Sequence, residues 1–382
     1  MQGGIKVKEE KMISDFLELT ALPVHSRDER QIADAVKEKL EALGLTVSEE
    51  EGVKEKVGGN TGNIRAVLAG DDRFPAILFS AHLDRVQNNG HIQAVYDEEE
   101  GCFRADGNTI LAADDVAGIC TILEALRQIT ASDKPHGMVE VALSVCEEAG
   151  VLGSRHFDFD SFRSRMAYVF DAPGRIGRLI LQAPSKCKLT YKIHGKSAHA
   201  GNEPEKGINA VRAAATLIME LPDSRLTPCT TANISTVHGG GATTNVVCDY
   251  AEVLAEVRST DQEEFLQTLK QCRQAAETVE KQYGVKIEYD ENIMYHTFKV
   301  EPDAPVVQIA AKAMKKLGIE PVYDRGGGGM DGNHFNCHGI AAIGVAPGYS
   351  KNHTPNEYLY KDDFLTCGSL AAELVWAAAE SE

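Results

Sequence analysis

Several apolar segments of this sequence end in histidine or acidic residues, and this pattern constrains the fold more than any other feature. The segment "ILFSAHLD" has the composition of a buried β-strand, and it ends in His82 and Asp84. The segment "VEVALSVCEE" ends in Glu147 and Glu148, and "AYVFDA" contains Asp171 after its apolar residues. Strands that are apolar throughout are typical of a parallel sheet covered on both faces by helices. We therefore expect these polar residues to follow the ends of strands in one such sheet.

Helical segments alternate with these strands, as they do in α/β domains. The segment "SRDERQIADAVKEKLEALG" has helical periodicity, with Ser26 as the expected N-cap and Gly44 at its end. Strands are expected at 74–84, 138–148, 165–172 and 339–346, and further helices at 114–129, 304–318 and 363–381. This alternation predicts an α/β domain whose mixed, mostly parallel sheet is covered by helices on both faces.

The middle of the chain follows a different order of elements. Between residues 184 and 293 the expected order is β-α-β-β-α-β, the pattern of a ferredoxin-like α+β sandwich. A length of 382 residues also suits two domains better than one. We therefore expect a discontinuous α/β domain formed by residues 1–183 and 294–382, interrupted by an inserted domain at 184–293.

Further acidic and histidine residues are expected at the same edge of the sheet. Asp114 and Asp115 stand at the start of a predicted helix, and His353 follows the last predicted strand. Open α/β sheets place their ligand sites at the carboxyl ends of the strands. Taken singly, an aspartate at a helix start is an ordinary cap, and a histidine after a strand is an ordinary structural residue. Together, these carboxylates would repel one another strongly unless a cation were bound.

Histidine and carboxylate side chains are ligands that suit zinc, and cobalt or manganese also bind such sites. Two histidines and three carboxylates exceed the ligand set of one catalytic zinc ion, and they fit two ions that share a carboxylate. Successive side chains at a strand end diverge. Of Glu147 and Glu148 we therefore expect one to bind metal and the other to act as a base on bound water. Asp84 is placed to orient the ring of His82.

Five motifs, "AHLDRV", "AADDVAG", "CEEAG", "VFDA" and "NHTPNEY", resemble in order and spacing those of the dinuclear zinc exopeptidases. That family includes aminoacylase, carboxypeptidase G and succinyl-diaminopimelate desuccinylase, and the sequence most resembles its peptidase T (tripeptidase) branch. The resemblance covers essentially the whole chain. It implies that residues 1–183 and 294–382 form a catalytic zinc-peptidase domain, and that residues 184–293 form a lid and dimerisation domain.

The resemblance also implies a metal ligand at each strand end. It makes Asp114 the bridging ligand of two divalent metal ions, with zinc as the first choice. His82 and Asp171 would complete the site of one ion, and Glu148 and His353 the site of the other. These five residues would then be the metal ligands of the chain.

The remaining acidic residues receive catalytic roles from the same resemblance. Glu147 would be the general base, and Asp84 the catalytic residue behind His82. Similar enzymes with an aspartate at the position of Asp171 tend to be aminopeptidases or dipeptidases, whereas those with a glutamate tend to be carboxypeptidases or deacylases. The resemblance therefore favours an aminopeptidase.

The choice of the bridging residue depends on the motif "AADDVAG". Relatives carry D-x-K-G at this place, which favours Asp114 over Asp115 as the bridge. This chain has Val116 where the lysine usually stands. The sequence therefore does not show which cation, if any, offsets the negative charge of Asp114 and Asp115.

Five further residues are candidates for contacts with substrate. His199, in "GKSAHAG", resembles a histidine that reaches the active site from the partner subunit and stabilises the reacting carbonyl oxygen, although it can equally be a loop histidine. Asn245 and Arg258 resemble residues that bind a substrate carboxylate, with an ordinary surface arginine as the alternative. The segment "DRGGGGMDGNHFN" resembles a carboxylate-binding loop, with Gly328 and Gly329 as the expected contacts, or is a flexible loop without a ligand.

Composition restricts the class of partner and the compartment. The chain has 57 acidic and 39 basic residues and a net charge of −18, which argues against nucleic acid or an anionic membrane as a partner. Nine cysteines without a C-x-x-C pair indicate reduced thiols. No apolar segment is long enough to span a bilayer, and the first residues lack the features of a signal peptide. We therefore expect a cytoplasmic protein.

The sequence thus predicts a cytoplasmic, metal-dependent aminopeptidase. It would release the N-terminal residue of short peptides through water activated by two metal ions, and it would form a homodimer through the inserted domain. Two alternatives stay open at this point. One is an N-acyl amino acid amidohydrolase or a carboxypeptidase on the same scaffold, and the other is a non-catalytic metal-binding relative.

Overall fold

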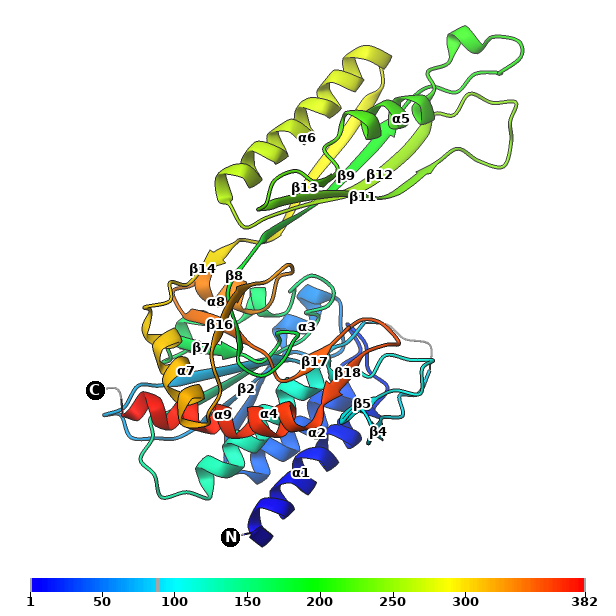
Figure 1. Cartoon of the computed structure of the whole chain (residues 1–382). Helices are drawn as coiled ribbons and strands as arrows, with labels where there is room; N and C mark the ends of the chain where they lie inside the picture. The colour runs from blue at the N-terminus through cyan, green and yellow to red at the C-terminus, as the bar shows by residue number, and fades with distance from the viewer. Residues whose placement is uncertain (1, 87–89, 381–382) are drawn as a thin grey trace. The chain divides into compact units, whose positions relative to one another are not determined.

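The structure, a computed structural model of the chain, describes residues 2–86 and 90–380. These residues form two compact units (Figure 1). The first unit combines the residues up to Ala183 with those from Lys299 onward, and the second unit spans Pro184–Phe298. The chain therefore leaves the first unit once and returns to it once.

The first unit is built around a nine-stranded mixed sheet. In spatial order its strands are β1 (Thr46–Glu50), β2 (Asn63–Leu68), β6 (Val139–Ser144), β3 (Ile77–His82), β7 (Met166–Val169), β16 (Ala341–Val345), β8 (Arg178–Ala183) and β14 (Phe298–Lys299), and β15 (Val322–Arg325) pairs with β8. The neighbours β6, β3, β7 and β16 run parallel to one another. β2 and β8 join this parallel centre by antiparallel pairing. The predicted mixed, mostly parallel sheet is confirmed.

Helices bury the central strands of this sheet. Every residue of β3 and of β6 is buried, as expected for strands covered on both faces. The helices of the unit are α1 (Gln2–Thr20), α2 (Arg30–Ala42), α3 (Gly52–Val57), α4 (Ala113–Thr130), α7 (Pro305–Lys316), α8 (Gly332–Cys337) and α9 (Lys361–Ala379). α4 packs against β3, α1 and α9, whereas α7 and α8 pack against β7 and β16 (Figure 1). The apolar sequence of the strands is thus explained by contacts with helices.

A small four-stranded sheet of the first unit was not expected from the sequence. Its strands are β17 (Tyr349–Ser350), β18 (Tyr358–Tyr360), β5 (Cys102–Arg104) and β4 (Val95–Asp97), and all neighbouring pairs are antiparallel. Each strand has only two or three residues, too few for a periodic pattern to be recognised. The sheet nevertheless fixes both ends of the segment that carries His353.

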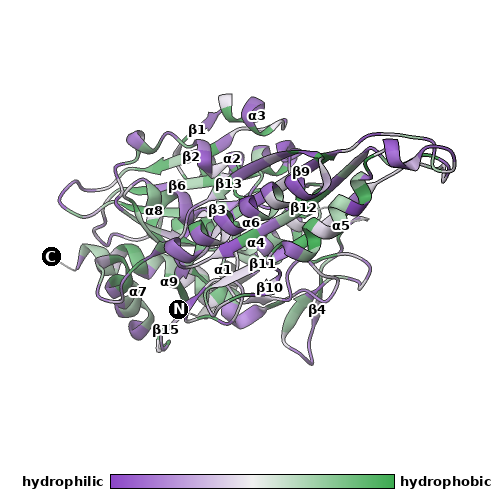
Figure 2. Ribbon diagram, turned by 90° about the horizontal axis from the view of Figure 1, so that it is seen from above, coloured by the Kyte–Doolittle hydropathy of each residue, from purple (hydrophilic) through white to green (hydrophobic). Residues whose placement is uncertain are grey.

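The second unit is an antiparallel sheet with two helices. The strands lie in the order β10 (Ser224–Arg225), β11 (Thr230–Gly239), β12 (Tyr250–Ser259), β9 (Ser185–His194) and β13 (Lys286–Tyr295), and the helices are α5 (Ala210–Glu220) and α6 (Gln262–Tyr283). Leaving aside the short β10, the chain order is the predicted β-α-β-β-α-β. Alternate residues of β9 are buried against the helices, and the buried residues of α6 recur every three or four positions, so its ribbon carries both hydrophilic and hydrophobic colours in Figure 2. Its ferredoxin-like class is confirmed.

Two expectations about the N-terminal part of the chain were incomplete or wrong. The helix α1 was not among the expected elements. The next helix, α2, begins at Arg30, so Ser26 is not its N-cap. The Ser26 hydroxyl instead donates a hydrogen bond to the buried carboxylate of Asp84, at 2.6 Å from Oδ2. Among the described helices, none combines the length and apolar character needed to cross a membrane.

Candidate metal centre and active site

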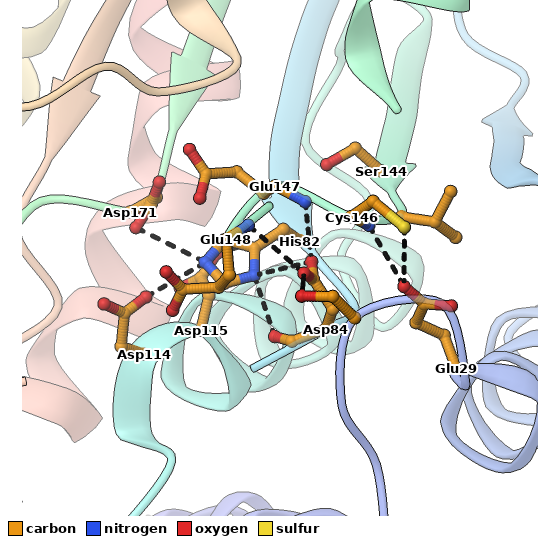
Figure 3. Close-up of polar contacts among 12 residues, drawn as sticks. Glu29, His82, Asp84, Asp114, Asp115, Ser144, Cys146, Glu147, Glu148 and Asp171 are labelled. Carbon is orange, nitrogen blue, oxygen red and sulfur yellow. Dashed lines mark hydrogen bonds and ion pairs between the residues drawn. The ribbon is translucent and has the colours of Figure 1, made fainter. Parts of the chain in front are cut away.

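The ends of three parallel strands carry most of the site. His82 is the last residue of β3, Glu147 and Glu148 follow β6, and Asp171 follows β7. Figure 3 shows these side chains pointing toward one another from their separate strands. His353 comes from the loop between β17 and β18. Residues far apart in the sequence therefore meet at one edge of the sheet.

His82 lies at the centre of this cluster (Figure 3) and is buried. Its Nε2 atom is 3.0 Å from Asp114 Oδ1 and 3.7 Å from Asp171 Oδ1. Burial lowers the pKa of His82, but the charge of Asp171 and the hydrogen bonds with Asp114, Asp171 and Asp84 outweigh it and hold the pKa well above its ordinary value. The ring therefore stands where a cation, either a proton or a metal ion, is stabilised.

Asp114 and Asp115 lie at the start of α4 but have different partners. The backbone there is not helical, since Ala112 has φ +60° and Asp114 has φ −82° with ψ 101°. The Asp115 carboxylate accepts hydrogen bonds from the backbone N–H groups of His82 at 3.1 Å and Gly118 at 3.2 Å. A Cβ atom at Gly118 would stand 2.3 Å from Asp115 Oδ1, so this position requires glycine. The Asp115 carboxylate is thus engaged by backbone N–H groups, whereas the Asp114 carboxylate faces the histidines.

The opposite side of the cluster is formed by His353 and Glu148. His353 Nε2 lies 2.7 Å from Glu148 Oε1 and 3.2 Å from Asp114 Oδ2. Hydrogen bonds with Asp114 and Glu148 raise the pKa of His353 to about 10. His353 has a φ of +61°, a left-handed conformation that turns its ring toward the acids. Asp114 therefore has one oxygen toward each histidine.

Two groups of potential metal ligands overlap at His82. One consists of His82, Asp114 and Glu148, and the other of His82, Asp115 and Asp171. Within each group the ligand atoms lie within 4.8 Å of one another. The pairing differs from the expected one in placing Asp115 beside Asp171. All five expected ligand positions nevertheless occur in this one cluster or in contact with it.

The pKa values of several carboxyl groups of the cluster are shifted from their ordinary values. Burial, with the charge of Asp114, raises the pKa of Asp171 to about 7, and burial, with the charge of Asp171, raises the pKa of Glu147 well above its ordinary value. Burial alone would raise the pKa of Asp114, but hydrogen bonds with His353 and His82 lower it. Uncompensated negative charge is thus the main electrostatic problem of the site, and divalent cations would relieve it.

Asp84 and Glu29 hold the segment that carries the two glutamates. Asp84 accepts hydrogen bonds from the backbone N–H groups of Glu147 at 2.8 Å and Glu148 at 3.1 Å. Glu29 accepts from the N–H of Cys146 at 3.1 Å and from its thiol at 3.3 Å (Figure 3). Three successive N–H groups therefore end on two buried carboxylates. The Glu29 contact was not foreseen, because nothing in the local sequence relates these segments.

The expected contact between Asp84 and His82 is present in an altered form. His82 Nδ1 is 2.9 Å from the backbone oxygen of Asp84 and 3.5 Å from its carboxylate oxygen Oδ1. The ring is therefore oriented mainly by the carbonyl of Asp84, and its carboxylate is mainly engaged by the backbone at Glu147 and Glu148. One residue thus links both strand ends.

A buried arginine, Arg85, supplies positive charge near the site, where Val116 replaces the lysine of similar enzymes. The side chain of Arg85 is buried and donates hydrogen bonds to two carbonyl groups at the end of α1. Burial lowers its pKa to about 10, against the attraction of Glu357 and Asp84. Arg85 therefore offsets part of the negative charge behind the cluster, where Val116 itself contributes none.

A pocket of about 190 Å³ opens beside the cluster. It is lined by Asp114, Glu147, Glu148, Asp171, Pro173, Arg178, Ile180, Gly326, Gly327, Gly328, Gly329, Met330, Tyr349, Asn352 and His353. The predicted Gly328 and Gly329 are among these residues, whereas Arg178 and Tyr349 were not foreseen. Tyr349 donates a hydrogen bond to Asp171 at 3.0 Å, and Arg178 pairs with Asp324 at 2.9 Å. Of the residues lining this pocket, only Arg178 carries a permanent positive charge.

The other three expected substrate residues belong to the second unit. His199 is exposed, and its Nδ1 accepts hydrogen bonds from the N–H groups of Gly201 and Asn202, both at 3.1 Å. Asn245 is exposed and accepts a bond from the N–H of Ala200 at 2.9 Å through its backbone oxygen. Arg258 lies on β12, where it pairs with Glu256 at 2.8 Å. His199 and Asn245 are therefore neighbours.

Comparison with known proteins assigns the family. The model of the "Peptidase dimerisation domain" matches residues 185–284, and the model of "Peptidase family M28" matches residues 63–199. The protein YqjE of Bacillus subtilis is 33% identical over 98% of this chain and 100% of its own length. Peptidase T of Shouchella clausii is 27% identical over 85% of both chains.

Solved structures agree with these matches. The aminopeptidase PepT of Bacillus cereus has 32% identity and a TM-score of 0.87, covering 97% of this chain and 99% of its own. A tripeptidase of Staphylococcus aureus has 31% identity and a TM-score of 0.91, covering 98% and 99%. This chain is a peptidase T-like member of the M20 peptidase family. It is therefore a peptidase, and the predicted family is confirmed.

Dinuclear metal binding occurs within the M20 family. The YXEP protein of Bacillus subtilis, a dinuclear metal binding peptidase of this family, shares the fold with a TM-score of 0.75 at 18% identity, covering 99% of this chain and 100% of its own. At this identity the likeness shows the shared fold.

Proposed function

We propose that this peptidase T-like chain is a metal-dependent aminopeptidase that releases the N-terminal residue of short peptides. One observation carries the proposal: two histidines and three carboxylates with the chemistry of metal ligands form one cluster, and all of them except His82 line one pocket together with a separate buried glutamate, Glu147. The names of the aminopeptidase PepT and of the tripeptidase, both more than 30% identical, support the choice of substrate.

Two divalent metal ions, zinc in the first place, are the cofactor that this donor set fits. Asp114 would be the ligand shared by the two ions, because its two oxygens face His82 and His353 separately. Asp171 would complete the site at His82, and Glu148 the site at His353. Asp115 is left out because both of its oxygens accept backbone hydrogen bonds. The raised pKa of Asp171 fits this assignment, because a bound cation would relieve the crowding of negative charge.

Glu147 is the proposed general base. When bound, the ions would polarise the scissile carbonyl and lower the pKa of a water molecule. Glu147 lines the pocket but belongs to neither group of potential metal ligands, so its carboxylate is available to take a proton from that water and pass it to the leaving amine. Asp84 holds the N–H of Glu147 and so fixes where the side chain starts.

His199 is proposed to stabilise the oxyanion of the reaction from the partner subunit. Its Nδ1 accepts two backbone hydrogen bonds, so the proton of the neutral ring resides on Nε2. An Nε2–H group is a donor, which is the property that a developing negative charge on a carbonyl oxygen requires. Asn245 and Arg258 are proposed to bind the carboxylate of the substrate, together with Gly328 and Gly329.

A homodimer through the second unit is part of the proposal. The match to the peptidase dimerisation domain covers most of this unit. Its helix α5 exposes apolar side chains, with Met219 at 83% and Val211 at 43% of full exposure, and Val237 on β11 is 55% exposed. Burial of these residues against a second copy would remove apolar surface from water. A Met219→Glu variant should therefore shift the dimer toward monomer in light scattering, whereas Lys270→Glu on α6 should not.

A reducing compartment is proposed for the protein. All nine cysteines are free thiols, and burial raises the pKa of five of them, Cys120, Cys146, Cys187, Cys272 and Cys367, which makes them poor nucleophiles. The cytoplasm is such a compartment. The negative net charge continues to argue against nucleic acid and membrane partners.

Hydrolysis of a peptide panel tests the proposed function. Di- and tripeptides with free or acylated N-termini would be given to protein loaded with zinc, cobalt or manganese, to chelated protein and to Glu147→Gln. We expect metal-dependent release of the free N-terminal residue, lost in Glu147→Gln while two ions per chain remain bound. Cleavage of acylated substrates alone would move the activity to an amidohydrolase. Full activity after chelation would overturn the metal assignment.

A further inference from the structure

Glu357 is a buried carboxylate beside the site that neither the predicted roles nor the proposed mechanism uses. Its side chain is 1% exposed. Oε2 accepts hydrogen bonds from the N–H groups of Leu111 and Ala112, both at 2.9 Å, and Oε1 accepts from the N–H of Asp114 at 3.1 Å. One carboxylate thus binds three N–H groups within four residues of chain.

These N–H groups need an acceptor because the backbone there is irregular. Ala112 has a positive φ, and Asp114 is not helical although it stands at the beginning of α4. N–H groups before and at the start of a helix have no partner within the helix, and a buried N–H without an acceptor is costly. A carboxylate is also favoured near a helix N-terminus by the helix dipole. Glu357 therefore stabilises a local conformation that the segment does not form by itself.

The segment that carries Glu357 also binds the Asp114 side chain. Asn352 Nδ2 donates to Asp114 Oδ2 at 2.6 Å, and His353 Nε2 lies 3.2 Å from the same oxygen. The other oxygen, Oδ1, is directed at His82. Residues 352–357 thus hold Asp114 at its backbone through Glu357 and at one carboxylate oxygen through Asn352.

We propose that Glu357 is a positioning residue of the metal centre, which sets the backbone of Asp114 so that its two oxygens face two different histidines. Asn352 completes this arrangement by restricting rotation of the carboxylate. Partners that orient a metal ligand from behind commonly change metal affinity by 10- to 100-fold when they are replaced. The inference rests on the proposed function, since it requires Asp114 to be a metal ligand.

Metal affinity, measured apart from activity, tests this inference. The full-length apo protein would be titrated with zinc and with cobalt in competition with a chromophoric chelator, and the unfolding temperature of each metal-free variant would be recorded. We expect Glu357→Gln to weaken the binding of at least one of the two ions by about 10- to 100-fold. The amide of glutamine offers only one acceptor atom, and its N–H₂ group would face a backbone donor.

Glu140 provides a matched control within the same unit. It is also a buried glutamate that accepts backbone hydrogen bonds, from the N–H groups of Arg163 at 3.2 Å and Ser164 at 2.7 Å, but it lies on β6 away from the ligand cluster. Glu140→Gln should lower the unfolding temperature of the metal-free protein without changing its metal affinity. An equal loss of affinity in Glu140→Gln and Glu357→Gln would overturn the inference, because general destabilisation would then explain both.

Asn352→Ala keeps the inference testable if Glu357→Gln does not fold. Asn352 lies on the partly exposed rim of the pocket, so its replacement removes the bond to Asp114 without opening a core cavity. A several-fold loss of metal affinity at unchanged unfolding temperature is expected. If wild-type protein binds two ions and both variants bind them equally well, the inference fails and the proposed function stands. If wild-type protein binds no divalent ion, both fail together.

Discussion

In the metal-free protein, the stability of the first unit is expected to fall as the pH rises. In the folded metal-free protein the pKa of two buried carboxyl groups near the site is raised toward neutral pH. Burial and the charge of Asp114 raise the pKa of Asp171 to about 7 from 3.8, and they raise the pKa of Glu357 to about 7 from 4.5. In the unfolded chain both groups return to their ordinary values and are ionised at lower pH.

The sign and size of the effect follow from the difference in bound protons. Between the unfolded and folded pKa values, each group binds one proton more in the folded state, so stability falls with rising pH. The loss is about 1.4 kcal/mol per group and pH unit. Between about pH 5.5 and about pH 7 the two groups together cost about 3 kcal/mol, because the difference in bound protons has already fallen to one half at the folded pKa. His353, whose pKa is raised to about 10, adds a loss of the same sign at higher pH.

Fluorescence of Trp376 offers a direct assay. It is the single tryptophan of the chain and lies on α9 in the first unit, so urea titrations followed by its emission report on the unit that holds the site. Chelated protein should be less stable at pH 7 than at pH 5.5, and Asp171→Asn should show about half of this difference. With zinc bound the trend should vanish or reverse, because metal ligands must be deprotonated. Equal or greater stability of chelated wild-type protein at pH 7 would refute the reasoning.

Three further predictions concern the catalytic cycle. Asp84→Asn replaces an acceptor of two backbone N–H groups by a side chain with one acceptor atom, so kcat should fall by about 10- to 100-fold with two ions still bound; an unchanged kcat would show that the backbone hold is dispensable. His199→Ala should lower kcat by about 100-fold or more, and mixing it with inactive Glu147→Gln should restore activity through mixed dimers if the histidine acts in the partner's site. Arg258→Met should raise KM by about 10-fold for tripeptides with a free C-terminal carboxylate and leave C-terminal amides unaffected; an equal effect on both would exclude carboxylate binding.

The elements that the sequence predicted best are those with a long, regular pattern. The apolar runs of β3 and β6 and the alternation in β9 correspond to full and one-sided burial respectively, and burial is the property that a periodic pattern encodes. The short strands of the small sheet and the helix α1 escaped prediction. Strands of two or three residues have no period, and the pairing of β18 with β5 joins residues about 250 positions apart in the chain.

The residues of the candidate site likewise fall into those that the sequence predicted and those that it did not. Four site residues could be predicted because they stand at or just after the ends of apolar strands: His82, Glu147, Glu148 and Asp171. The topology of a parallel sheet brings such strand ends to one edge. Glu29, Arg178 and Glu357 have no such signal. Their contacts join segments separated by more than one hundred residues, such as Glu357 with Leu111, or depend on a pocket wall built by several elements.

The sequence by itself determined which residue types stand at the strand ends, because hydrophobic periodicity is local and each strand exit can be recognised within ten residues. It also determined the inserted α+β unit, whose order of elements is legible along the chain. Only the tertiary structure decided which hydrogen-bond partners each acidic residue has. Asp115 accepts hydrogen bonds from backbone N–H groups, whereas Asp114 faces two histidines. The Ser26 hydroxyl donates to Asp84 instead of capping a helix. The physical reason is that a buried carboxylate takes whichever donors the fold brings within hydrogen-bond distance, and those donors come from segments that are distant in sequence.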